Sequence, residues 1–141
     1  MYGGHVVALA ILCAIDTLSS YAFRSLVTDR CEQCGRTDKV GPKYRNYTHD
    51  FFPRDYQKFS DKIYRLYRNS ITHSWNLFEA GMILGDDPIQ AVNGPIVFGL
   101  RHFFNALKMS VDTFIGKLRD EPKLQEAALL RYRVFRSIAR P

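Results

Sequence analysis

Apolar residues recur at spacings of three and four along most of this chain, which is the period of an amphipathic helix. Residues 5–27 predict a first helix whose apolar face consists of Val6, Leu9, Ala10, Cys13, Thr17 and Tyr21. A short helix is expected over 44–52, because Pro53 disfavours helical conformation in the residue before it. A longer helix is expected from residue 54 to about residue 75.

The helix expected over 54–75 has two distinct faces. Its apolar face consists of Phe59, Ile63, Leu66, Tyr67 and Ser70. The opposite face is polar and largely basic, and consists of Lys58, Lys62, Arg65, Asn69 and Thr72. A core-facing side and a basic stripe therefore lie back to back.

The pattern changes after Trp75. Short β-prone runs around Asn93-Gly94 predict a small antiparallel ribbon over about 77–100, since Asn-Gly is a strong hairpin signal. Helical spacing returns from residue 101, with an apolar stripe of Phe103, Phe104, Leu107, Val111, Phe114, Ile115 and Leu118. The segment Asp120-Glu121-Pro122 opens a last helix, whose expected buried side is Ala127, Leu130, Val134 and Ile138.

These elements predict a mainly α fold, an antiparallel bundle of about four to five helices with a small β-ribbon insertion. The length of 141 residues suits one domain over 1–141 and excludes a TIM barrel or a large two-domain enzyme. Residues 28–43 collect charges, Gly35, Gly41 and Pro42, and predict a long mobile loop.

Charge, hydropathy and cysteine content indicate the kind of partner and the cellular compartment of the protein. Twenty Lys and Arg against fourteen Asp and Glu give a net charge of +6, which favours anionic partners such as nucleic acid. The strongest apolar run, 6–15, is shorter than the roughly 20 residues that cross a bilayer, and residues 1–5 lack the cations of a secretory signal. Three cysteines are too few for a disulfide scaffold. We expect a cytoplasmic protein without a membrane partner.

The segment 64–75 carries the most informative motif of the chain. Arg68 is followed by Asn69 and, after four intervening residues, by His73, while two tyrosines precede the motif and Trp75 follows it. This block resembles the HEPN superfamily of small helical proteins, whose ribonuclease members carry Arg-(x4 to x6)-His with a polar residue after the Arg. In its HepT-like toxins the motif continues His-x-Tyr, so Trp75 departs from that pattern and the tyrosine's role is not carried over.

These residue types suit RNA cleavage on chemical grounds. A guanidinium binds phosphate through parallel hydrogen bonds and stabilises charge on its oxygens, which is a role for Arg68. An imidazole exchanges protons near neutral pH, which is a role for His73. No acidic residue lies between Asp61 and Glu79 to hold a divalent metal, so we expect metal-independent chemistry that needs no cofactor.

The resemblance implies an RNA endonuclease of the toxin or defence type that acts at a dimer groove. Transesterification needs one base and one acid, and a homodimer supplies two copies of the histidine. The candidate catalytic residues are Arg68, His73 and Asn69, and the candidate RNA-binding residues are Lys58, Lys62, Arg65 and Thr72. RNA and an antitoxin or other protein are the expected partners. The alternative is a non-catalytic HEPN-like module that binds a protein, a nucleotide or RNA.

Helix geometry constrains the motif. Five residues of an ideal helix separate Arg68 from His73 by about 140°, so a helix end, a kink or a partner subunit has to bring them together. Asn69 and His73 share a face. A structural alternative is that Arg68 ends the basic stripe and His73 caps the helix C-terminus. A second pair, Arg45-Asn46, reaches His49 after only three residues and falls outside the motif.

Two further groups of residues are candidates for binding. Cys31 and Cys34 form half of a zinc site, which Cys13, His5, His49 or a second subunit would have to complete. A redox pair and an ordinary reduced loop are the alternatives. The last helix carries Arg131, Arg133, Arg136 and Arg140, which suits a phosphate backbone or a solvated basic face equally.

Overall fold

The computed structural model describes residues 2–23, 29–30, 37–38, 40–69 and 80–139. Over these residues the chain is mainly α-helical, as the sequence predicts. The helices are α1 (Tyr2–Ala22), α2 (Gly41–Phe51), α3 (Arg54–Gln57), α4 (Ser60–Arg68), α5 (Leu100–Asp120) and α6 (Pro122–Ile138). The strands are β1 (Asp29–Arg30), β2 (Thr37–Asp38), β3 (Ala80–Ile83), β4 (Gln90–Ala91) and β5 (Ile96–Gly99).

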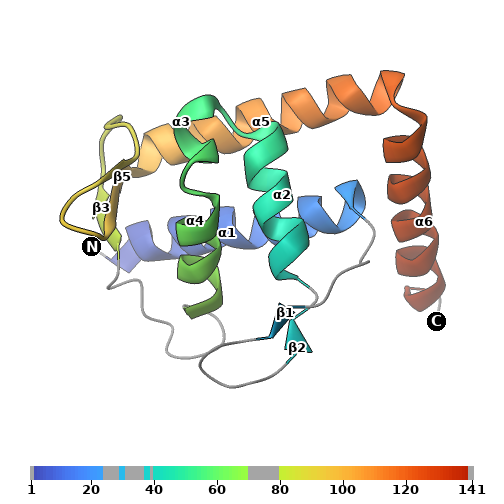
Figure 1. Ribbon diagram of the computed structural model, residues 1–141, viewed down its shortest axis with the longest axis horizontal. Coiled ribbons are helices and arrows are strands. Elements are labelled where there is room, and N and C mark those ends of the chain that lie inside the picture. Colours follow the sequence, from blue (N-terminus) through green and yellow to red (C-terminus); the bar gives the residue numbers. More distant parts are fainter. Residues whose placement is uncertain (1, 24–28, 31–36, 39, 70–79, 140–141) are drawn as a thin grey trace.

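The helices cross one another. In Figure 1, α1 and α5 run along the length of the molecule, α2 and α4 stand side by side across them, and α6 turns away at one end. Helix α2 packs against both α1 and α4, and α6 packs against α1 and α5. This arrangement does not confirm the expected antiparallel bundle.

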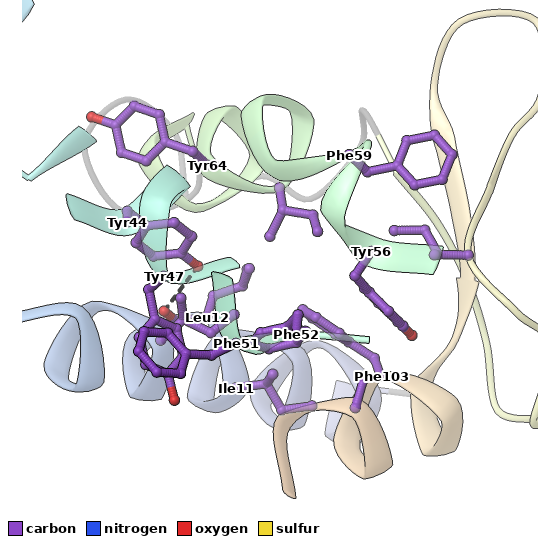
Figure 2. Close-up of a cluster of buried hydrophobic side chains, with 14 of the residues drawn as sticks. Ile11, Leu12, Tyr44, Tyr47, Phe51, Phe52, Tyr56, Phe59, Tyr64 and Phe103 are labelled. Carbon is purple, nitrogen blue, oxygen red and sulfur yellow. Dashed lines mark hydrogen bonds between the residues drawn. The ribbon is translucent and has the colours of Figure 1, made fainter. Parts of the chain in front are cut away.

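Aromatic residues fill the core between these helices (Figure 2). Tyr47 stacks on Phe51 with ring centroids 4.8 Å apart, and Tyr56 stacks on Phe103 at 5.6 Å. The Tyr47 hydroxyl lies 3.3 Å from the Ser110 hydroxyl, so a buried phenol has a polar partner on α5. Burial raises the pKa of Tyr47 to about 12, because the ionised phenolate is poorly solvated in the core.

The buried face of α1 is not the one that we predicted. Four residues of the predicted face are exposed, namely Val6 at 66%, Ala10, Cys13 and Thr17, and the other two, Leu9 and Tyr21, are only half-buried. The face that packs on the core consists of Ala8, Ile11, Leu12, Ile15, Ser19 and Ala22. Because α1 is apolar on both sides, spacing alone does not distinguish the packed side from the exposed one.

Helix α1 is also long and apolar enough to span a membrane. Its segment Gly3–Ala22 has a mean hydropathy of 1.6, and one third of the most apolar window is buried within the protein. A core helix of a globular protein and an N-terminal signal sequence share these properties, so the feature is weak evidence for a membrane span.

The single helix expected over 54–75 is interrupted. Helix α3 ends at Gln57, and α4 begins at Ser60. The Ser60 hydroxyl donates a hydrogen bond to the Gln57 carbonyl at 2.6 Å, which is a local alternative to a helical bond. The predicted faces are nevertheless confirmed for the described part of this segment, because Phe59, Ile63 and Leu66 are buried while Lys58, Lys62 and Arg65 are exposed.

The predicted ribbon is partly antiparallel. Strands β4 and β5 form a hairpin whose turn places Asn93 and Gly94 at positive φ, 53° and 107°. Strand β3, however, pairs in parallel with β5, so the expectation of a wholly antiparallel ribbon is wrong. Along the chain, β4 lies between β3 and β5, while in the sheet it lies on the far side of β5. The segment that contains β4 therefore provides the crossover that parallel pairing of β3 with β5 requires.

Helix α6 buries much less than we expected. Ala127 is half-buried, but Leu130, Val134 and Ile138 are exposed at 40%, 42% and 78%. Leu124 is the one buried residue of this helix. Residues 129–139 are all exposed, so the apolar stripe continues along α6 without a covering element among the described residues.

Candidate functional site

Arg68 ends α4, and a tyrosine one turn earlier orients its side chain. The half-buried Arg68 donates a hydrogen bond from Nη1 to the hydroxyl of Tyr64 at 3.0 Å. Tyr64 is only 5% exposed, and Figure 2 shows it at the margin of the aromatic cluster. Because a phenol is neutral, this hydrogen bond orients the guanidinium without cancelling its charge.

Arg45 of α2 approaches the same tyrosine. Its guanidinium carbon lies 5.1 Å from the centroid of the Tyr64 ring, which is the distance of a cation–π contact. Arg45 Nη1 also lies 3.8 Å from Oδ1 of Asp61, whose Oδ2 is 3.0 Å from Nε of Arg65. We call Arg45, Arg65 and Arg68 the arginine cluster.

The arginine cluster includes a residue that sequence reasoning set aside. Spacing excluded Arg45 from the motif, because it precedes His49 by too few residues. Its proximity to Tyr64 arises from the packing of α2 on α4, which no local pattern reveals. Within the described part of the chain, the Asp61 carboxylate pairs with two of these arginines, and the three guanidiniums and this carboxylate together carry a net charge of +2.

The predicted basic stripe begins at Lys58, just after α3, and continues on α4, and part of it contacts the protein itself. Lys62 donates a hydrogen bond to the Gly94 carbonyl in the β4–β5 turn. Lys58 Nζ lies 5.1 Å from the centroid of the Phe59 ring. Asn69 is half-buried and continues the helical conformation, with its backbone N–H directed at the carbonyls of Arg65 and Leu66.

Two tyrosines, the buried Tyr44 and the half-buried Tyr67, hold α4 against its neighbours. Tyr67 donates from its hydroxyl to Oδ2 of Asp16 on α1 at 2.9 Å, and its ring stacks on Tyr44 at 4.8 Å. Tyr44 in turn donates to the Leu12 carbonyl at 3.0 Å. Burial raises the pKa of Tyr44, so this phenol remains a neutral donor. The end of α4 that carries Arg68 is therefore braced against α1 and α2.

Several predicted site residues lie outside the described part of the chain. These are His73, Thr72, Cys31 and Cys34, so the expected break between Arg68 and His73 and the expected cysteine pair stay predictions. Among the residues that the structure describes, no group of three or more His, Cys, Asp or Glu side chains is arranged to hold a metal ion.

No protein-family model, curated protein or solved structure matches this chain. The resemblance to the HEPN superfamily therefore rests on the residues of the Arg68–His73 motif.

Proposed function

We propose that the protein is a HEPN-like RNA endonuclease of the toxin or defence type, cytoplasmic and acting as a homodimer. The observation that best supports this proposal is the position of Arg68. A buried, neutral tyrosine orients its guanidinium at the end of a braced helix whose outer face is basic. Such an arrangement suits a charged group that binds a phosphate, since the protein holds it in place before the ligand arrives.

The proposed reaction is a metal-independent transesterification. His73 of one subunit takes the proton of the ribose 2′-OH, whose oxygen attacks the adjacent phosphorus. The bond from phosphorus to the 5′-oxygen breaks, and His73 of the other subunit returns a proton to that oxygen. The products are a 2′,3′-cyclic phosphate and a 5′-hydroxyl. Arg68 stabilises the negative charge that builds on the phosphate oxygens, and Asn69 orients the imidazole or the phosphate.

The test separates chemistry from folding. Arg68→Ala and His73→Ala should each abolish cleavage of single-stranded RNA, while Arg119→Ala, at an exposed arginine of α5, should leave it unchanged. Cleavage should persist in EDTA. We expect the melting temperature of His73→Ala to stay near that of the unmutated protein, because the expected role of His73 is chemical. Activity that survives both substitutions, or that EDTA removes, would contradict this mechanism.

A non-catalytic HEPN-like module is the second candidate, and Trp75 favours it because the HepT-like pattern has tyrosine there. On this proposal the same helix binds an antitoxin or other protein, a nucleotide or RNA without cutting. No cleavage would then be detected, and His73→Ala would weaken only the complex with that partner.

A further inference from the structure

We propose that Arg45 and Arg65 form a second phosphate-binding site beside Arg68. This second site holds the phosphodiester next to the one that Arg68 binds, on the same RNA strand. This inference rests on the proposed RNA-directed function and adds a residue, Arg45, that the motif does not contain. Arg45 and Arg68 both contact Tyr64, one at the ring and the other at the hydroxyl. The two guanidiniums therefore share one tyrosine side chain, Arg45 over its ring and Arg68 at its hydroxyl.

The contacts of Arg45 and Arg65 with Asp61 are weak enough to rearrange. Arg45 reaches the carboxylate only at 3.8 Å, and the closer pair of Arg65 and Asp61 has both side chains more than half exposed, at 63% and 56%. Exposed ion pairs of this kind contribute about 0 to 1 kcal/mol. A phosphodiester can replace them, because its oxygens accept two parallel hydrogen bonds from each guanidinium.

Asp61 has a definite role in this arrangement. Without a ligand, its carboxylate keeps two arginines of the cluster near each other despite their like charges. When a phosphate binds, the same carboxylate repels it. Removing the charge of Asp61 should therefore tighten RNA binding, whereas removing an acidic residue that merely stabilises the fold would not.

Tyr64 links the second site to the motif. Tyr64→Phe keeps the ring under Arg45 and removes the hydroxyl that accepts from Arg68. This change should lower the rate of cleavage at saturating RNA and leave the affinity for RNA nearly unchanged. The variant thus distinguishes the orientation of Arg68 from the binding by Arg45.

The experiment measures binding of a single-stranded RNA that is 2′-O-methylated throughout, so that no 2′-hydroxyl can attack. Fluorescence anisotropy over a series of salt concentrations gives Kd and its salt slope. Each phosphate contact to a single strand contributes about 0.7 to that slope. Arg45→Ala should therefore flatten the slope by about 0.7 and weaken binding about fivefold at 0.1 M salt. Asp61→Asn should tighten binding a few-fold.

Two variants serve as controls. Arg119→Ala removes an exposed arginine far along α5 and should change neither Kd nor slope. Arg45→Lys keeps the positive charge and should recover most of the salt slope, which keeps the proposal testable if the alanine variant misfolds. Circular dichroism checks the folding of both variants independently.

Binding and cleavage can fail separately. If Arg45→Ala weakens binding but no RNA is cut, the phosphate site stands and the endonuclease proposal falls. If RNA is cut but Arg45→Ala and Asp61→Asn leave Kd and slope unchanged, the second site is wrong and the endonuclease remains. The phosphate site is also wrong if the unmutated protein does not bind RNA. It is equally wrong if Arg45→Ala abolishes only the binding of a protein partner.

Discussion

The exposed stripe of α6 makes a stability prediction that can be tested with two matched substitutions. Leu124 is 6% exposed and lies in the first turn, whereas Ile138 is 78% exposed in the last turn. Leu124→Ala removes a buried side chain and should cost about 2 to 5 kcal/mol of the free energy of unfolding. Ile138→Ala should change it by no more than about 0.5 kcal/mol, because its side chain is already in water.

These free energies convert to measurable shifts of the melting temperature. An unfolding entropy of about 2.1 cal/mol/K per residue gives about 0.3 kcal/mol/K for this chain. Leu124→Ala should then lower the melting temperature by roughly 7 to 17 °C, and Ile138→Ala by less than about 2 °C. Differential scanning calorimetry at two protein concentrations provides the measurement.

A loss for Ile138→Ala as large as that for Leu124→Ala would refute this reasoning. It would mean that the stripe is covered in the folded protein. A loss that grows with protein concentration would identify a second copy of the chain as the cover, and a loss independent of concentration would identify a contact within the chain.

Two further predictions concern the core and a turn. Because the folded pKa of Tyr47, about 12, exceeds the ordinary value near 10, its contribution to stability is complete below pH 10 and is lost as pH rises toward 12. In urea unfolding experiments, Tyr47→Phe should reduce the loss of unfolding free energy at alkaline pH by up to about 3 kcal/mol. An unchanged loss would contradict the raised pKa of Tyr47 as its cause. Gly94→Ala should destabilise the fold by about 1 kcal/mol because φ is 107°, whereas Gly116→Ala, at a helical position of α5 with open space around an added Cβ, should stabilise it by a similar amount. Equal effects of the two glycine substitutions on the melting temperature would show that backbone conformation is not the cause.

Features that depend on neighbouring residues were predictable from the sequence. Pro122 begins α6 where expected, and Asn93-Gly94 forms the hairpin turn. Both depend on backbone preferences that act within a few residues. The two faces of α4 also follow from spacing, because polar residues occupy one side of that helix only.

Features that depend on packing were not predictable. The buried side of α1 could not be chosen, since apolar residues line both sides and its contacts with α2, α4, α5 and α6 decide between them. The parallel pairing of β3 with β5 joins segments that the β4 hairpin separates in the chain. In the same way, Arg45 joins the candidate site only because α2 lies beside α4.

The position of Arg68 depends on the tyrosine-rich packing of α4. A half-buried guanidinium is costly to desolvate unless hydrogen bonds compensate, and the Tyr64 hydroxyl provides such a bond without introducing a negative charge. A carboxylate at that position would bind Arg68 more strongly, but it would also repel the phosphate that the arginine is proposed to bind. Tyr67, tied to Asp16 on α1, prevents the end of α4 from shifting. The buried aromatic residues thus stabilise the fold and also hold a positive charge at the surface, where RNA is proposed to bind.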